Sequence, residues 1–373
     1  MFVVAGSKKE TKEIAIKKSG KKNDMCIESI NEGKTKDNET DLSNLDEKEL
    51  KIKEVEKELK EHKILGENFE VVNFLGSGSE SDVFGIRNKK NKKVFVLKKI
   101  LKHKMKTKNV NELKIASKLK QKNIIDFYGY SSSQKNNTEF IVMENAKFGN
   151  LRNFQIKTVK RSCLSESMLC YFIFQILNGL AYMHRCKIAH MDIKPQNIVI
   201  DEFLNAKIID FSISINYKGK KPNDEFKLPF KGTNFYMPLE VLDEKKIQYK
   251  DLNKVDAYAL GVLLYTFAFG CYPYDLTYED SKDYKVINQK MEKNLEFDNK
   301  NDLSSTFIDF VSKLLEKDIN QRMSIYEALK HPWIKAAELL VLEKDNLYNI
   351  SSFVIKLMID GIKSFNDFVR MKK

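Results

Sequence analysis

The sequence predicts an α+β fold in which strand-like segments come first and helical segments follow. Short, largely apolar runs at residues 69–75 and 94–100 have the length and the flanking turns of β-strands. The longest apolar stretch, residues 260–274, contains glycines and a proline and is shorter than the ~20 residues that a membrane-spanning helix needs. We therefore expect a buried helix in that stretch and no membrane span.

The turn after the first strand, residues 75–83, is rich in glycine and serine and leads into a second strand. Glycine lets backbone N–H groups approach a phosphate without a side-chain clash. A dinucleotide-binding loop would open a helix instead, and short glycine turns without a special function are also frequent. Because Ser81 replaces the third glycine of the phosphate-covering pattern, we expect a stiffer loop. The candidate nucleotide-binding residues here are Leu75, Gly76, Gly78 and Val83.

Two adjacent lysines in the next apolar strand, Lys98 and Lys99, are rivals for a phosphate-contacting role. Strand alternation places their side chains on opposite faces of the sheet. The pattern V-A-I-K, here with Val96 at the alanine position, favours Lys98. A buried lysine needs a carboxylate partner. Glu112, which opens a helical segment at 112–119, is placed to supply it; the alternative is a solvated helix charge.

Two polar motifs later in the chain combine the side chains that phosphoryl transfer requires. Asp192 and Asn197 lie in the segment 190–197, and Asp210 follows Asn197 by thirteen residues. Such a reaction needs an aspartate that takes the hydroxyl proton, plus an amide and a carboxylate that hold magnesium on the phosphates. Either motif alone could be an aspartate in a polar loop or at a strand end, so their order and spacing carry the interpretation.

Taken in order, these motifs resemble those of the eukaryotic protein kinase superfamily. The resemblance covers residues 66–334 and implies a bilobal protein kinase fold, with a small β-rich N-terminal lobe and a larger, mainly α-helical C-terminal lobe. It implies that Glu240 pairs with Arg322 and that Asp256 holds the backbone of the catalytic loop. It assigns no subfamily. Further segments that fit it are 232–240, the end of an activation loop; 256–261, the start of a buried central helix; and 331–334, the last helix of the domain.

The resemblance implies a site for ATP and magnesium between the lobes. Asp192 would orient the substrate hydroxyl, and Lys194 would steady the transferred phosphoryl group. The expected catalytic residues are Asp192, Lys194, Lys98 and Glu112, and the expected metal ligands are Asn197 and Asp210. Further expected nucleotide contacts are the side chains of Val83, Val96 and Val199, the gatekeeper Met143, and the backbones of Glu144 and Ala146. Taken singly, each of these apolar residues could instead be ordinary core.

The resemblance also bears on the substrate and on regulation. Lys194, with Thr233 in the substrate-binding segment, matches kinases that phosphorylate Ser or Thr hydroxyls of proteins, because tyrosine kinases usually differ at the lysine position. Met191 replaces the arginine that usually precedes the catalytic aspartate, and it cannot form charged hydrogen bonds to a phosphate. Residues 218–231 contain no hydroxyl side chain. We therefore expect that phosphorylation of the activation loop is not the switch.

Two other functions stay open. Departures from the family pattern suggest a pseudokinase, which would be an ATP-binding or scaffolding module; they are Ser81, Met191, Ser212 and the segment 238–240. None of these groups would touch the transferring phosphate, so activity is favoured. A small-molecule kinase of related fold is disfavoured, because the segment 232–240 belongs to a platform for protein substrates.

Composition narrows the partners and the compartment. The net charge of +13 arises mainly in the kinase-like region, because the first 65 residues carry equal numbers of acidic and basic side chains. A basic surface can attract nucleic acid, but lysine and asparagine are abundant throughout, so solvated lysines are the simpler interpretation and nucleic acid is not expected. Five cysteines without C-x-x-C spacing predict neither a disulfide framework nor a zinc site. Reduced thiols fit a cytoplasmic or nuclear location.

Both ends of the chain extend beyond the kinase-like region. Residues 1–65 form a charged N-terminal extension, and its first 40 residues lack apolar periodicity and are expected to be disordered. An amphipathic helix is predicted near residues 45–63, from the spacing of Leu45, Ile52, Val55 and Leu59. We expect it to pack on the small lobe, with binding of a regulatory partner as the second possibility. The C-terminal tail, residues 335–373, is expected to be helical and apolar enough to dock, and is a second candidate site for a regulatory partner.

Overall fold

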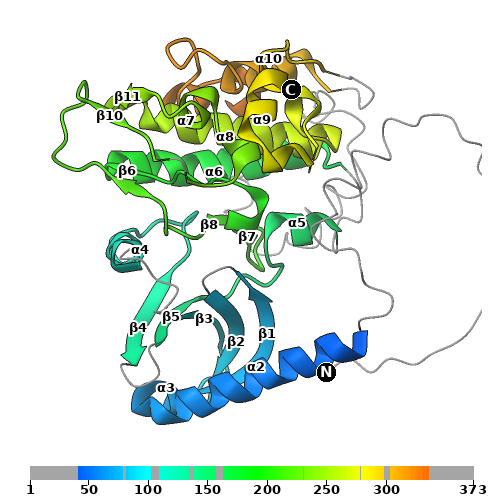
Figure 1. Ribbon diagram of the computed structural model, residues 1–373. Helices are drawn as coiled ribbons and strands as arrows, with labels where there is room; N and C mark the ends of the chain where they lie inside the picture. Colours follow the sequence, from blue (N-terminus) through cyan, green and yellow to red (C-terminus); the bar gives the residue numbers. More distant parts are fainter. Residues whose placement is uncertain are drawn as a thin grey trace, which may run out of the picture.

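A computed structural model describes most of the chain between residues 41 and 335. The described residues are 41–78, 81–101, 109–133, 138–156, 163–229, 231–277, 279–297 and 303–335. The first 40 residues, expected to be disordered, and the tail after residue 335, expected to be helical, lie outside the described residues. The described part forms a lobe built on a β-sheet and a larger, mainly helical lobe (Figure 1). This confirms the bilobal α+β fold expected from the sequence.

The small lobe is built on a five-stranded antiparallel sheet with the strand order β1-β2-β3-β5-β4. The strands are β1 (Phe69–Ser77), β2 (Ser81–Asn88), β3 (Val94–Leu101), β4 (Phe127–Ser133) and β5 (Thr138–Glu144). Helix α4 (Asn109–Ala116) follows β3. It begins and ends three residues earlier than the expected segment 112–119. It ends early because Lys118 N–H bonds to Ile115 O, only three residues back, and closes the helix with a tight turn.

Strand register sorts the side chains of the sheet onto two faces. Val83 lies directly opposite Lys98, and Val96 lies opposite Met143. Direct partners in an antiparallel pair share a face, and so do residues two apart in one strand, so these four side chains lie together. They face the helical lobe, because Lys98 contacts Asp210 there.

Helix α2 (Asp41–Glu61) runs along the other face of the sheet, on the side away from the helical lobe (Figure 1). Val55 and Leu59 are buried there against side chains of β2, β3 and β5. The helix begins earlier than the expected residues 45–63 and ends at Glu61. His62 then takes an extended backbone (φ −91°, ψ 96°), which separates α2 from the short helix α3 (Lys63–Asn68).

Two long helices form the centre of the large lobe, α6 (Glu166–Arg185) and α8 (Leu252–Phe269), and both are largely buried. The buried helix expected at residues 260–274 thus starts eight residues earlier, at Leu252. It ends at Phe269 because Gly270 takes a left-handed φ of 76° and caps it. Within the described part of the chain, no helix is long and apolar enough to cross a membrane.

The remaining elements of the large lobe are short. Its helices are α5 (Leu151–Phe154), α7 (Leu239–Leu242), α9 (Tyr284–Met291), α10 (Ser305–Leu314) and α11 (Ile325–Ala328). Its strands are β6 (Ile188–Ala189), β7 (Ile198–Ile200), β8 (Ala206–Ile208), β9 (Ile215–Asn216), β10 (Glu225–Lys227) and β11 (Lys246–Gln248). They form three two-stranded sheets, β6-β9, β7-β8 and β10-β11.

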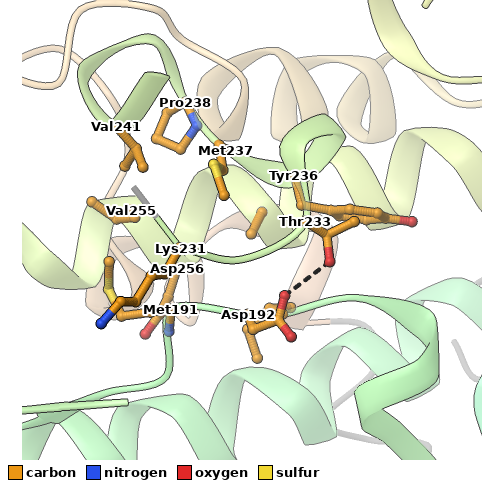
Figure 2. Close-up of a pocket in the computed structure, with 12 residues that line it drawn as sticks. Met191, Asp192, Lys231, Thr233, Tyr236, Met237, Pro238, Val241, Val255 and Asp256 are labelled. Carbon is orange, nitrogen blue, oxygen red and sulfur yellow. Dashed lines mark hydrogen bonds between the residues drawn. The ribbon is translucent and has the colours of Figure 1, made fainter. Parts of the chain in front are cut away.

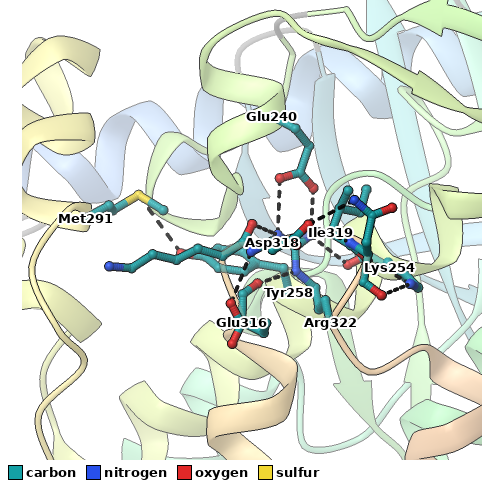
Figure 3. Close-up of polar contacts among 10 residues, drawn as sticks. Glu240, Lys254, Tyr258, Met291, Glu316, Asp318, Ile319 and Arg322 are labelled. Atoms are coloured by element: carbon teal, nitrogen blue, oxygen red, sulfur yellow. Dashed lines mark hydrogen bonds and ion pairs between the residues drawn. The ribbon is translucent and has the colours of Figure 1, made fainter.

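A buried ion pair ties the segment after the activation loop to the large lobe. Arg322 Nη1 and Nη2 lie 2.6 and 3.1 Å from the two carboxylate oxygens of Glu240 (Figure 3). Both residues are buried, and the guanidinium also lies 4.9 Å from the centre of the Tyr258 ring. The pairing of Glu240 with Arg322 that the sequence predicts is therefore confirmed.

Candidate active site

Lys98 contacts one carboxylate in its own lobe and one in the large lobe. Its Nζ lies 2.9 Å from Glu112 Oε1 on α4 and 3.4 Å from Asp210 Oδ1. Burial alone would lower the pKa of Lys98, but the two carboxylates more than offset this effect and raise it. Lys98 is therefore protonated, and it forms the ion pair with Glu112 that was expected from the sequence. The neighbouring Lys99 lies on the opposite face of the sheet, where it contacts only α2 carboxylates among the ion pairs of the described residues.

The backbone around Asp210 points its carboxylate toward Lys98. Asp210 has a left-handed φ of 65°, which is uncommon for a residue with a side chain. The next residue, Phe211, is buried and packs edge-on against the His190 ring, whose Nε2–H donates to Ile209 O at 2.9 Å. Burial would raise the pKa of Asp210, but the positive charge of Lys98 and hydrogen bonds from Ser212 lower it below the ordinary value. Asp210 is therefore an ionised carboxylate in the cleft.

Asp192 lies at the centre of a hydrogen-bond network in the loop between β6 and β7. Asn197 Nδ2 donates to the Asp192 backbone oxygen at 2.8 Å and to its Oδ2 at 2.9 Å. Lys194 Nζ lies 2.7 Å from Asp192 Oδ2. Thr233 Oγ1 donates to Asp192 Oδ1 at 3.1 Å (Figure 2), and it accepts from Lys194 Nζ at 2.8 Å. The network joins this loop to the segment that precedes α7.

Asp256, near the start of α8, binds the backbone of the same loop. Its carboxylate accepts from the backbone N–H groups of His190 and Met191, both at 2.8 Å, and from His184 Nε2 at 2.7 Å. Burial would raise the pKa of Asp256, but these donors lower it below the ordinary value. The expected contact between Asp256 and the catalytic loop is therefore confirmed. It also holds Met191, whose φ of 70° is left-handed.

The apolar candidates for a nucleotide site line the cleft face of the small lobe and one strand of the large lobe. Val83, Val96 and Met143 share the sheet face that carries Lys98, and all three are partly buried. Val199 lies on β7, which an isolated bridge connects to Asn150, the N-cap residue of α5. Leu75 is 50 % exposed at an irregularity of the β1–β2 pairing.

In the connection after β5, some backbone groups are already hydrogen-bonded, which limits the groups that a nucleotide base could use there. The N–H of Glu144 already donates to Asp126 O at 2.9 Å, and the carbonyl of Ala146 accepts from Gly149 N–H at 3.0 Å. A base edge at this position would therefore use the Glu144 carbonyl and the Ala146 N–H. In the glycine-rich hairpin, Gly78 N–H donates to Ser81 O at 2.7 Å, which closes the turn. A Cβ on Gly76 would meet no atom within 4 Å, so the protein's own packing does not require glycine there.

The side chains in the cleft fit magnesium and a polyphosphate. Asp210 offers a carboxylate, and Asn197 offers its amide oxygen, because its Nδ2 is used by Asp192. Across the described residues, no group of three His, Cys, Asp or Glu side chains could hold a metal ion alone. Magnesium suits such a site, because it typically takes one or two protein carboxylates and completes its shell with substrate phosphates and water. Lys98 supplies positive charge on the other side of the cleft.

Comparison with known proteins agrees with this geometry. Residues 69–334 match the family described as the protein kinase domain. The chain belongs to the protein kinase family. It is 30 % identical over 271 residues to an Aurora kinase of Schizosaccharomyces pombe, which covers 71 % of each chain. It is 29 % identical over 272 residues to the serine/threonine-protein kinase Aurora-2 of Arabidopsis thaliana, which covers 72 % of this chain and 90 % of that one. An Aurora kinase of Eremothecium gossypii is 32 % identical over 277 residues, or 72 % and 69 % of the two chains.

Two departures of this chain from the family pattern leave nearby contacts of the site in place. Ser212, which replaces a glycine, is not among the residues with a left-handed backbone, so this conformation accommodates a side chain. Its N–H donates to Asp210 Oδ1 at 3.4 Å. Glu240, in the unusual segment 238–240, still forms its ion pair with Arg322.

Several contacts of this chain were missed by sequence reasoning. Lys207 on β8 pairs with the Glu144 carboxylate at 3.0 Å, and Lys51 on α2 reaches the glycine-rich hairpin. Tyr217, Phe226 and Tyr249 form an aromatic stack beside the activation segment. No local signal distinguishes either lysine in a chain with 65 Lys and Arg residues.

Proposed function

We propose that this protein is an ATP- and magnesium-dependent kinase that transfers the γ-phosphate of ATP to Ser and Thr hydroxyls of protein substrates. The observation that carries the proposal is the joint placement of Lys98 between Glu112 and Asp210. In kinases, the lysine–glutamate pair and the metal-binding aspartate must both be in place for activity. The contacts of Lys98 with Glu112 and with Asp210 support the proposal.

Each side chain in the cleft has a distinct task in this proposal. Magnesium bound by Asp210 and Asn197 would neutralise charge on the phosphates when present. Lys98 would hold the α- and β-phosphates, kept in register by Glu112. Asp192 would orient the attacking hydroxyl and accept its proton, while Lys194 offsets negative charge on the transferred group. Catalysis would then rest on positioning and charge stabilisation rather than on a covalent intermediate.

The contact between Lys194 and Thr233 supports Ser and Thr as the acceptors. Thr233 and Lys194 both bond to Asp192, so the hydroxyl acceptor must approach a carboxylate that is enclosed on two sides. Lys194 and Thr233 are the two residues that match Ser- and Thr-directed kinases in the sequence, and they contact each other at 2.8 Å beside Asp192. Similarity to Aurora serine/threonine kinases, at about 30 % identity, is in line with this assignment.

The activation segment is held by contacts that need no phosphate. Strand β10 pairs with β11 in antiparallel register, and Phe226 stacks on Tyr249 with ring centres 4.2 Å apart and an interplanar angle of 6°. Tyr217 also stacks with Tyr249, with ring centres 6.4 Å apart, and the Tyr217 hydroxyl donates to His184 O at 3.1 Å. Burial raises the pKa of Tyr217, so this hydroxyl stays protonated and keeps donating.

These contacts offer a physical reason for regulation without activation-loop phosphorylation. A phosphate in this loop usually orders it through arginine side chains. Here Met191 lacks that charge, while strand pairing and the aromatic stack order the same segment. We expect protein treated with a phosphatase to retain most of its activity. Loss of activity after that treatment would refute this part of the proposal.

Transfer of labelled γ-phosphate from ATP to generic protein substrates, with and without magnesium, tests the enzyme directly. Asp192→Asn and Asp210→Ala should each abolish transfer, and phosphoamino-acid analysis should find phosphoserine and phosphothreonine. Glu202→Gln is the matched control, because this exposed carboxylate lies in the turn between β7 and β8 and is not among the expected site residues. Nucleotide that raises the melting temperature without any transfer would favour the pseudokinase. Label found mainly on tyrosine would refute the acceptor class.

A further inference from the structure

Lys51 lies outside the segment that matches the protein kinase family, yet it contacts the glycine-rich hairpin. Its Nζ donates to Ser77 Oγ at 2.7 Å and to Asp82 Oδ1 at 3.3 Å. The Ser77 hydroxyl donates in turn to the Asp82 carboxylate. The same ammonium lies 5.1 Å from the centre of the Phe74 ring and 3.5 Å from Glu47, one turn earlier on α2.

The two acceptors of Lys51 lie opposite each other at the base of the glycine-rich tip, which we call the mouth of the hairpin. Ser77 and Asp82 are the last paired residues of β1 and β2 before the glycine-rich tip. Asp82 also lies directly opposite Lys99, so its side chain belongs to the outer face of the sheet. Val83 and Lys98 occupy the inner face. Lys51 therefore contacts the hairpin on the outer face of the sheet and would touch neither the nucleotide nor magnesium.

Buried contacts one and two turns later fix α2 in this position. Val55 and Leu59 are 0 and 3 % exposed beneath the helix. Lys99, which is also 3 % exposed, lies 2.7 Å from Glu54 and 2.9 Å from Glu58. These contacts favour one position of α2 along the sheet, because a shifted helix would leave Lys99 buried without a carboxylate partner. Lys51 is thus delivered to the hairpin by a helix that cannot slide freely.

We propose that Lys51 is a positioning residue for ATP, which acts by holding the glycine-rich hairpin at the depth where its backbone N–H groups meet the phosphates. Glycine-rich turns have high conformational freedom, and that freedom must be lost when a ligand binds. A tether at the mouth of the hairpin reduces this loss before the nucleotide arrives, which is preorganisation. The inference rests on the proposed kinase function and adds the N-terminal extension to the nucleotide site.

The test compares the affinities of ATP and adenosine for the full-length protein by calorimetry. Lys51→Met should weaken ATP binding about fivefold, as expected for a charged hydrogen bond worth ~1 kcal/mol. Adenosine, which lacks phosphates, should bind with unchanged affinity. Lys53→Met is the matched control, since this exposed lysine lies on the same helix. Lys51→Arg should restore ATP affinity, and Ser77→Ala should weaken it in the same direction by removing one of the two acceptors of Lys51.

Kinetics and melting temperatures separate a positioning role from a structural one. Lys51→Met should raise the KM for ATP with kcat retained, and its melting temperature should match that of Lys53→Met. Unchanged ATP affinity, an equal loss for adenosine, or an equal loss in Lys53→Met would each overturn the proposal. Wild-type protein that binds ATP but transfers no phosphate would refute the proposed enzyme and leave the Lys51 comparison valid. Wild-type protein that binds no ATP would refute both.

Discussion

Replacing Glu240 with glutamine should destabilise the large lobe by about 3–5 kcal/mol, the usual cost of leaving one partner of a buried ion pair unpaired. Arg322 would keep its charge at 1 % exposure. Its remaining hydrogen bonds to carbonyl oxygens satisfy its N–H groups but provide no opposing charge; the acceptors are Glu316, Lys317 and Lys254. Domains of roughly this size lose about 2–4 °C of melting temperature per kcal/mol, so the midpoint should fall by about 10 °C.

The chain provides its own probe for this measurement. Trp333 is the single tryptophan, and it is buried in the large lobe. Its fluorescence during urea unfolding therefore reports on the lobe that contains the ion pair. Lys313→Met is the matched control, since it breaks a 2.7 Å ion pair with Asp309 whose side chains are 52 and 50 % exposed. An exposed pair of this kind should contribute at most ~0.5 kcal/mol.

A double variant decides whether the buried charge is the cause. Glu240→Gln combined with Arg322→Met removes both charges, so its loss of stability should be smaller than the sum of the two single losses by at least ~1 kcal/mol. Additive losses would refute the reasoning. So would a Glu240→Gln protein whose unfolding free energy lies within ~1 kcal/mol of the wild type.

Glu112→Gln should lower kcat roughly tenfold or more in steady-state assays, because Lys98 loses a buried charged partner, and an unchanged kcat would contradict its role. Tyr249→Ala should lower kcat/KM for a protein substrate without changing the KM for ATP, because it removes the centre of the aromatic stack; a selective rise in the ATP KM would count against this. Asp256→Asn should lower the free energy of unfolding, and this loss should have its full size above about pH 4. The difference in unfolding free energy from wild type should shrink in more acidic solution. The pKa of Asp256 is lowered in the folded state, so its carboxylate stabilises the fold while ionised and stops doing so as the pH falls through that pKa. A difference in urea midpoint between variant and wild type that is equal at pH 7 and pH 3 would contradict this prediction.

Short-range rules explain which parts of the site could be predicted. Strand alternation separates Lys98 from Lys99, and the structure places them on opposite faces of the sheet. The ends of the predicted helices were less accurate, because they depend on single backbone conformations. The extended residue His62 and the left-handed Gly270 end their helices at points that apolar periodicity does not mark.

The sequence by itself determined which side chains meet in the cleft, because its motifs specify a set of side chains whose order along the chain indicates a common site. Only the tertiary structure decided what holds that cleft in place. Lys51 meets Ser77 across 26 residues of chain, and Tyr217 meets Tyr249 across a loop. Such contacts depend on how helices and strands pack, and a lysine or tyrosine on a packed surface carries no local mark of its distant partner.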